Sequence, residues 1–211
     1  MTVDGDQAHL GQKVDPDSAL VEVDGIPLPI KPGLVHYLLY KPAGVVSTAD
    51  DPQGRRTVVE LVPDDTRVYP VGRLDVDSEG LLIVTNDGAL TELLTHPRHG
   101  VTKTYLARVK GEPAAPVIRR LEAGVDLEDG PARAASARTI DSFGDEALVE
   151  LVMTEGRNRE VRRMLDAVGH PVTALVRTAI GPLRDGSLRP GTWRVLSVAE
   201  IRSLYGAADL R

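Results

Sequence analysis

Three acidic side chains stand close together in the segment 72–80, whose sequence is GRLDVDSEG. Asp75, Asp77 and Glu79 alternate with other residues, and the glycines at both ends favour an exposed loop. The apolar run 81–85, LLIVT, follows directly and predicts a strand in the protein interior. A loop fixed by a buried strand holds its side chains rigidly, which is the support that a catalytic group needs.

The loop could present a catalytic carboxylate. Arg73 and Asp75 are two residues apart, so on an extended backbone both side chains project to the same face. A guanidinium within about 4–6 Å keeps a carboxylate ionised at neutral pH. An ionised carboxylate can act as a base or as a nucleophile. On this hypothesis Asp75 does the chemistry and Arg73 supports it.

Two other interpretations of the loop stay open on spacing alone. The three acids and Gly80 match positions 1, 3, 5 and 6 of a calcium-binding loop. The position that requires a glutamate in such a loop is Asn86, however, and a strand rather than a helix follows. The other interpretation is a solvated acidic turn without chemical function.

A second candidate site is the arginine-rich segment 155–164, EGRNREVRRM. The spacing predicts a helix that begins near Asn158, a residue type that caps helices. Arg159, Arg162 and Arg163 then share one face, opposite an apolar stripe. A helix N-terminus with several guanidiniums suits phosphate groups or a carboxylate partner. The simpler interpretation is a charged face in contact with solvent.

The composition excludes several other kinds of site. The chain has no cysteine, which removes disulfides, thiolate metal ligands and a cysteine nucleophile. Its five histidines lack the spacing of a zinc site. The sequence also contains no phosphate-binding glycine loop, no dinucleotide fingerprint and no serine-nucleophile turn. We therefore expect neither a metal nor a nucleotide cofactor.

Charge is distributed unevenly along the 211 residues. The formal net charge is −6, from 25 basic and 31 acidic residues, yet residues 156–194 hold eight arginines against three acids. A polyanion would be attracted to that segment rather than to the whole surface. No apolar stretch approaches the roughly 18 residues needed to cross a bilayer, and the start resembles no secretion signal. We expect a cytoplasmic protein without a membrane partner.

The elements that must position these two segments alternate irregularly between strands and helices. The patterns predict strands at 36–40, 81–85, 102–109, 132–140, 147–153, 172–178 and 191–196, and helices at 89–95, 117–123, 161–168 and 198–205. This order favours an α+β fold with a mostly antiparallel central sheet flanked by helices. Pro27, Pro29 and Pro32 indicate a linker, so a boundary near residue 30 divides a short β-rich piece, 1–30, from residues 31–211.

Five motifs occur in an order that resembles one enzyme family. They are YKPAGV at 40–45, GRLD at 72–75 with EGLLIVTNDG at 79–88, KTY at 103–105, GRNREVRRM at 156–164 and TALVRTAIGPL at 173–183. Over about residues 35–205 the chain resembles the Rsu-type ribosomal-RNA pseudouridine synthases, and among them the branch acting on large-subunit (23S) rRNA. The resemblance implies the pseudouridine synthase catalytic fold. It also implies an isomerase that converts a specific uridine in a structured rRNA hairpin to pseudouridine without a cofactor, and we expect a monomer.

The same resemblance assigns roles to individual residues. It implies that Asp75 is the essential carboxylate, that Arg162 pairs with it, and that Tyr105 stacks on the target base. Leu175 is expected to line the pocket. We also expect the substrate to be bound by Arg73, Arg157, Arg159, Arg163 and Arg177. Because the reacting atoms are inaccessible in a stacked nucleotide, the uridine must be flipped out of the RNA.

Residues 1–30 resemble the end of the small RNA-binding domain that precedes the catalytic domain in these enzymes. The helical first half of that domain is absent, so we expect a truncated domain with weaker RNA binding of its own. The main alternative to the enzyme is a non-catalytic ribosome-binding or assembly protein of the same fold. Two further alternatives are a synthase for small-subunit (16S) rRNA and a small-substrate hydrolase that uses Asp75 with Asp77 or Glu79.

Overall fold

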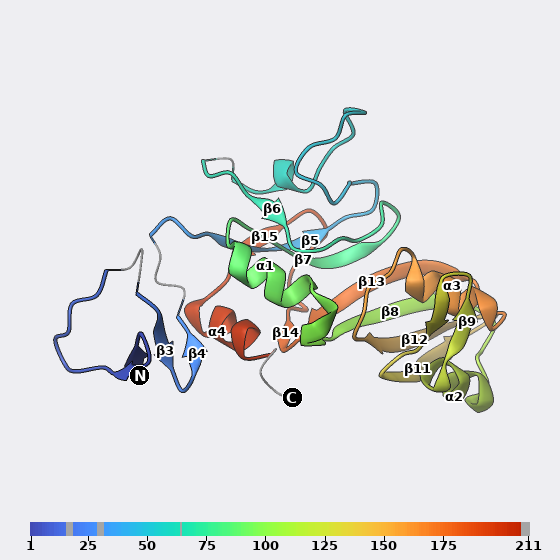
Figure 1. Cartoon of the computed structure of the whole chain (residues 1–211). Coiled ribbons are helices and arrows are strands. Elements are labelled where there is room, and N and C mark those ends of the chain that lie inside the picture. The colour runs from blue at the N-terminus through green and yellow to red at the C-terminus, as the bar shows by residue number, and fades with distance from the viewer. Residues whose placement is uncertain (16–18, 29–31, 64, 208–211) are drawn as a thin grey trace.

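The centre of the molecule is a large sheet (Figure 1). A computed structural model describes residues 1–15, 19–28, 32–63 and 65–207. In spatial order the strands are β11 (Ser136–Phe143), β12 (Glu146–Met153), β8 (Lys103–Lys110), β13 (Val172–Ile180), β7 (Glu79–Thr85), β5 (His36–Lys41) and β15 (Trp193–Val195), with β6 (Tyr69–Pro70) on β7 and β14 (Leu183–Arg184) on β13. Within the described residues these pairs are antiparallel except β7 with β13. The predicted α+β fold is confirmed.

Helices and short turns complete two halves of this sheet. In the first half, β5, β7 and β15 carry α1 (Gly88–Thr95) and α4 (Val198–Gly206). In the second half, β8, β11, β12 and β13 carry α2 (Ala115–Ala123) and α3 (Glu160–Ala167), beside the hairpin of β9 (Val125–Leu127) and β10 (Gly130–Ala132). The 3₁₀ turns η1 (Val59–Leu61) and η2 (Pro97–His99) belong to connecting segments. Figure 1 shows the two halves side by side, with β13 of the second half next to β7 of the first.

The first half buries both faces of its sheet. Leu81 and Ile83 of β7 belong to the cluster that packs against α1 and α4. Leu82 and Val84 belong to a different cluster, formed with the segment between β5 and β6. A strand covered on both faces has no need of alternating polar residues, which explains the continuous apolar run.

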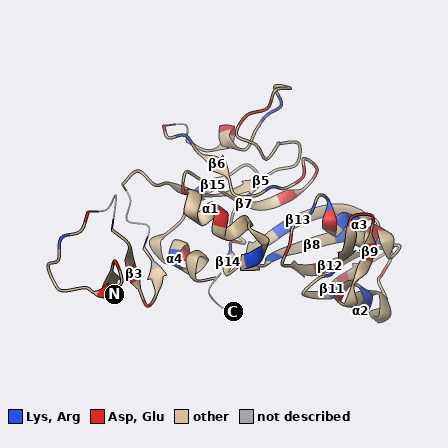
Figure 2. Cartoon of the chain, viewed as in Figure 1, with Lys and Arg blue, Asp and Glu red and all other residues tan. Residues whose placement is uncertain are grey.

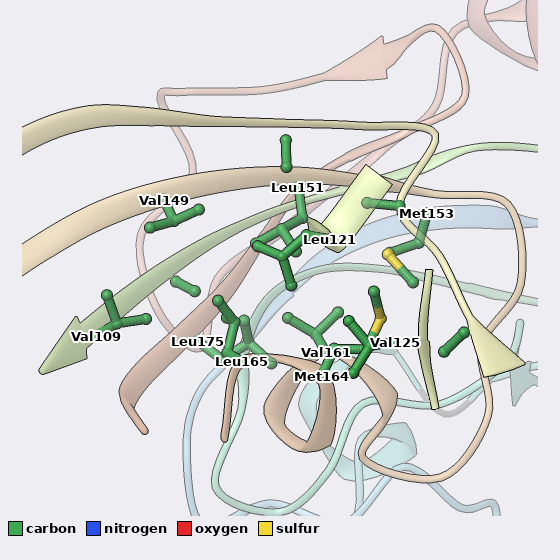
Figure 3. Close-up of a cluster of buried hydrophobic side chains, with 14 of the residues drawn as sticks. Val109, Leu121, Val125, Val149, Leu151, Met153, Val161, Met164, Leu165 and Leu175 are labelled. Carbon is green, nitrogen blue, oxygen red and sulfur yellow. The ribbon is translucent and has the colours of Figure 1, made fainter. Parts of the chain in front are cut away.

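The second half buries one face of its sheet. Along β12, buried residues alternate with more exposed ones, and Val149, Leu151 and Met153 point to the core. Figure 3 shows these side chains next to Met164 and Leu165 of α3. The opposite face of the sheet in this half is more open to solvent.

The two halves meet where β7 runs parallel to β13. Gly80 of β7 pairs with Arg177 of β13, and its φ of 111° lies in a region that favours glycine. A side chain at Gly80 would overlap the backbone of Arg177. This close approach brings the loop that ends at Gly80 directly against the second half.

The helices α1 and α3 begin in different ways. Asp87 caps α1 by accepting a hydrogen bond from the N–H of Leu90. The apolar stripe of α3 is as predicted. Asn158, however, does not cap α3: the capping position is Arg159, whose backbone is left-handed with φ 48° and whose side chain makes no capping bond.

A small second sheet lies at the N-terminal end. Its spatial order is β2 (Asp6–Gln7), β1 (Thr2–Val3), β3 (Val21–Val23) and β4 (Ile26–Pro27). It contacts α4, where Ile26 lies against Gly206. Part of the predicted linker, 29–31, lies outside the described residues. Among the described helices, none has the length and apolar content required to traverse a bilayer.

Candidate active site

A buried lysine supports the loop that carries Asp75. Lys41, the last residue of β5, is 0% exposed. Its ammonium donates hydrogen bonds to the carbonyl oxygens of Pro42 (3.0 Å), Asp75 (3.0 Å) and Ser78 (2.7 Å). Burial lowers the pKa of Lys41 to about 8, although nearby carboxylates oppose the shift. The ammonium therefore fixes the loop backbone at Asp75 and again three residues later.

The segment after Lys41 holds the same loop at two further points. The hydroxyl of Ser47 donates to the carbonyl oxygen of Leu74 (2.9 Å) and accepts from the Leu74 N–H (3.1 Å). The N–H of Gly44 donates to the carbonyl oxygen of Val76 (2.7 Å). The YKPAGV motif and Ser47 thus form a rigid base for the loop, a role that the sequence pattern alone does not indicate.

Two arginines reach the loop from the second half. Arg159 donates two hydrogen bonds to the Asp77 carboxylate, both of 3.0 Å, and its Nη1 lies 3.8 Å from Oδ2 of Asp75. Arg162 donates to the Asp77 carbonyl oxygen (3.1 Å) and to Oγ of Ser78 (3.3 Å), and its Nη2 lies 3.4 Å from Oδ2 of Asp77. The expected ion pair between Arg162 and Asp75 is therefore replaced: Arg159 is the partner of Asp75, and Arg162 binds the two residues 77–78.

Arg159 and Arg162 differ in backbone conformation and in exposure. Arg159 has a left-handed conformation at the capping position of α3, whereas Arg162 lies within the helix. The side chain of Arg159 is 43% exposed, whereas that of Arg162 is 11% exposed. The hydrogen bonds from Arg159 hold the pKa of Asp77 below its usual range.

Asp75 lies at a pocket of about 60 Å³ between the two halves of the sheet. The pocket is also lined by Tyr105 of β8, Leu175 of β13, Met153 of β12 and Arg159. The Asp75 side chain is 23% exposed, so its carboxylate is supported from behind and still accessible. The structure thus brings the predicted residues Asp75, Tyr105 and Leu175 to one place from three distant segments.

Arg157 and Arg163 bind other residues of the protein in this structure. Arg163 forms two hydrogen bonds with the Asp129 carboxylate, of 2.8 and 3.0 Å. Arg157 binds Glu160 (3.0 Å) and the carbonyl oxygen of Pro131 (2.7 Å). Both arginines tie α3 to the β9–β10 turn, so their expected contact with RNA stays a prediction.

Arg73 lines the pocket of Asp75, whereas Arg177 does not. The predicted pairing of Arg73 with Asp75 is not formed, because Arg73 has no ion pair among the described residues and its side chain is exposed. Arg177 is only 4% exposed and donates to the carbonyl oxygens of Leu81 (2.8 Å) and Arg73 (3.4 Å). Arg177 therefore links the two halves at their junction.

Known proteins match the chain over most of its length. The family model for RNA pseudouridylate synthase matches residues 35–167. An uncharacterized RNA pseudouridine synthase of Mycobacterium leprae is 45% identical over 99% of this chain and 83% of its own length. The ribosomal large subunit pseudouridine synthase B of Bacillus subtilis is 41% identical over 95% of this chain and 83% of its own length. A crystal structure of a pseudouridylate synthase has a TM-score of 0.73 at 28% identity, over 96% of this chain and 87% of that one.

The chain belongs to the RNA pseudouridylate synthase family. It is therefore an isomerase that acts on RNA, and its sheet is the catalytic fold of that family. The resemblance drawn from the five sequence motifs is confirmed at the level of family, fold and enzyme class.

Two acidic residues, Glu155 and Glu160, lie beside Arg157 in this pseudouridine synthase. Burial raises the pKa of Glu160, and the neighbouring Glu155 raises it further, while hydrogen bonds from Arg157 oppose the shift. Both acids line the pocket that holds Asp75. The pocket therefore contains carboxyl groups in different environments, which is typical of functional sites.

The loop acids of the synthase point to different partners rather than to one metal ion. Asp77 is bound by Arg159, and Glu79 interacts with Tyr40, where burial and then Glu79 raise the pKa of the tyrosine. The described part of the chain holds no group of three or more His, Asp or Glu side chains able to bind a metal. The calcium-loop interpretation gains no support from this geometry.

Proposed function

We propose that this enzyme converts a specific uridine of large-subunit ribosomal RNA to pseudouridine, with Asp75 as the catalytic carboxylate. The observation that carries the proposal is the position of Asp75, accessible at a pocket shared with Tyr105 and Leu175 and backed by Lys41. Relatives named ribosomal large subunit pseudouridine synthase B are 37–41% identical over 95–100% of this chain, which supports the choice of RNA.

The reaction rearranges bonds without net oxidation or reduction. The bond between the sugar C1′ and the uracil N1 breaks, the uracil turns in place, and C1′ bonds to C5. The proton on C5 leaves and N1 gains one, so the formula is unchanged. Asp75 starts this sequence as a nucleophile or a base, and either role needs an ionised carboxylate within reach of a flipped-out nucleotide.

The other residues of the pocket orient the substrate. In this proposal Tyr105 stacks on the target uracil and Leu175 forms the apolar side of the pocket. Arg159 stabilises negative charge at Asp75, and Arg162 fixes the loop that carries it. The arginine-rich segment attracts the RNA backbone, as phosphates are bound by guanidiniums and helix N-termini. Residues 1–30, as part of a small RNA-binding domain, add contacts farther from the pocket.

The test uses purified protein and unmodified 23S and 16S rRNA transcribed in vitro. We expect wild-type protein to form pseudouridine at one site in 23S rRNA, detected by chemical mapping of the modified base. Asp75→Asn should form none and still bind the RNA, whereas Asp126→Asn, on the exposed part of β9, should behave as wild type.

Each alternative gives a different result in the same experiment. A product in 16S rRNA alone would replace the proposed target by the small subunit. Binding of rRNA by wild-type protein without any product would favour the non-catalytic assembly protein. Full activity of Asp75→Asn would remove the catalytic role of this carboxylate.

A further inference from the structure

A second cavity adjoins the pocket of Asp75 on the far side of Tyr105. It has a volume of about 220 Å³ and shares Arg73, Tyr105 and residues 155–157 with the first pocket. Lys103, at the start of β8, and Arg177, on the neighbouring β13, line only the second cavity of the two. Since typical ligand sites hold about 300–1,000 Å³, this cavity suits a fragment of a nucleotide rather than a whole cofactor.

Two cationic groups in this cavity have donors without a partner. Nη2 of Arg177 is buried and has no hydrogen-bond acceptor. The ammonium of half-buried Lys103 makes neither a hydrogen bond nor an ion pair with any described residue. Buried charged donors normally find acceptors, because an unsatisfied one costs about 1–3 kcal/mol or more. A buried guanidinium donor and a nearby ammonium without a protein partner point to an acceptor that comes from outside the chain.

The positive charges of Lys103 and Arg177 also repel one another. Burial lowers the pKa of Lys103 to about 8, and the positive charge of Arg177 contributes to the shift. Glu155 is the acidic residue of the cavity, but its carboxylate lies 3.4 Å from Nη2 of Arg157. Arg73 adds a further positive charge at the border. The cavity therefore has an excess of positive charge, and an anion would stabilise it.

We propose that this cavity binds a backbone phosphate of the RNA, next to the nucleotide whose base enters the pocket of Asp75. Tyr105 lies between the two hollows, so a ligand in the second is a direct neighbour of a base stacked on that ring. A phosphodiester supplies oxygen acceptors for both Lys103 and Arg177. This inference rests on the proposed function, because it needs an RNA substrate in the first pocket.

The experiment compares Lys103→Met with Lys110→Met, which removes an exposed lysine at the other end of β8. The RNA is a synthetic hairpin that carries the uridine mapped in the preceding assay. Loss of one phosphate contact should weaken binding of the hairpin to Lys103→Met about tenfold and reduce the slope of log affinity against log salt by about one. Lys110→Met should match wild type in both measurements.

A chemical change in the RNA identifies the phosphate. Methylphosphonate is placed, one position at a time, at the phosphates on either side of the target uridine, which removes the negative charge there. At one of these positions wild-type protein should lose about tenfold in single-turnover rate, and Lys103→Met should lose nothing more. Equal losses in wild type and Lys103→Met at every position would overturn the phosphate site while leaving the proposed function intact. Absence of product with unmodified RNA and wild-type protein would instead contradict the proposed function.

The pH dependence offers a second readout. The titratable and charged groups around Lys103 are Arg73, Tyr105, Glu155, Arg157 and Arg177. Above pH 8 the lysine loses its proton, so hairpin binding by wild type should weaken, and Lys103→Arg should keep its affinity to higher pH. A wild-type profile identical to that of Lys103→Arg would contradict a charged role for this lysine. Thermal unfolding of each variant shows that the effects arise in the folded protein.

Discussion

The two halves of the large sheet differ in how they are covered and in what they give to the active site. The first half, with β5 and β7, is packed on both faces and provides the loop of Asp75, whose backbone carbonyl oxygens accept hydrogen bonds from the side chains of Lys41 and Ser47. The second half is packed on one face and provides side chains, among them Tyr105 and Arg159. Figure 2 shows basic segments on β13 and α3 in this second half.

This difference suggests a division of labour between the halves. A catalytic carboxylate must keep one position, and a backbone anchored by buried groups is well suited to that. An RNA-binding surface must admit and release a large polyanion, and long side chains on an exposed face can adapt to it. The junction of β7 and β13 is then the point on which the geometry of the active site depends.

The largest effect should follow from a change at this junction. Gly80→Ala places a Cβ against the backbone of Arg177 and forces a non-glycine residue to adopt φ 111°. The combined overlap and strain should destabilise the protein by about 3 kcal/mol or more, with loss of most activity. Urea unfolding and pseudouridine formation measure the two effects.

Gly186→Ala is the matched control for this junction. Gly186 has no atom near the place of a Cβ, and its φ is not in the region that favours glycine. We expect this variant to be as stable and active as wild type. If Gly80→Ala were as stable as wild type, the two halves could move apart at β7 and β13 without a loss of stability.

The next largest effect should follow from removing the support under the loop. Lys41→Met leaves the carbonyl oxygens of Pro42, Asp75 and Ser78 without their shared donor. A displaced Asp75 should lower kcat about 100-fold, whereas KM for RNA should change little because the second half is intact. Steady-state kinetics separate the two parameters. A change in KM alone would assign Lys41 to RNA binding instead.

The two arginines of the second half should differ in their importance. Arg162→Met removes a mostly buried guanidinium that binds residues 77–78 of the loop, and we expect about a 100-fold loss of kcat. Arg159→Met removes a more exposed group, and we expect about a tenfold loss. Single-turnover assays of both variants provide the comparison. A larger loss for Arg159→Met would make charge at Asp75 more important than the position of its loop.

Much of the architecture was predictable because it follows from local patterns. The double-sided burial of β7 gives a continuous apolar run, and the stripe of α3 has helical spacing. The active site itself was reached only through the resemblance to a family, since Asp75, Tyr105 and Leu175 lie on separate segments. No spacing rule places them in one pocket.

Other features depend on single backbone or burial states that a sequence does not display. Arg159, which approaches Asp75, has a left-handed backbone conformation that the sequence pattern does not indicate. Lys41 and Lys103 resemble surface lysines at strand ends, yet one is fully buried and the other lines a cavity. A lysine at a strand end gives no signal of its burial, because burial depends on segments far away in the chain.

The smallest effect should arise in the first half, away from the junction. Asp87 accepts hydrogen bonds from Tyr205 (2.8 Å) of α4 and from the ring of His36 (2.9 Å) in β5. Burial opposes ionisation of Asp87, but these bonds and that of the Leu90 N–H hold its pKa below the usual range. Tyr205→Phe removes one donor, so the free energy of unfolding at neutral pH should fall by about 1 kcal/mol, as measured in urea.

This variant also has a signature in acid. Because the folded-state pKa of Asp87 is depressed, its contribution to stability is present above the unfolded value near 4 and is lost as the pH falls through the folded value. The difference in stability between wild type and Tyr205→Phe should therefore shrink below about pH 4. Pseudouridine formation should be unchanged, since none of these residues lines either hollow of the active site. A loss of activity as large as that of Arg159→Met would show that the first half transmits small packing changes to Asp75, and that its rigidity extends as far as α4.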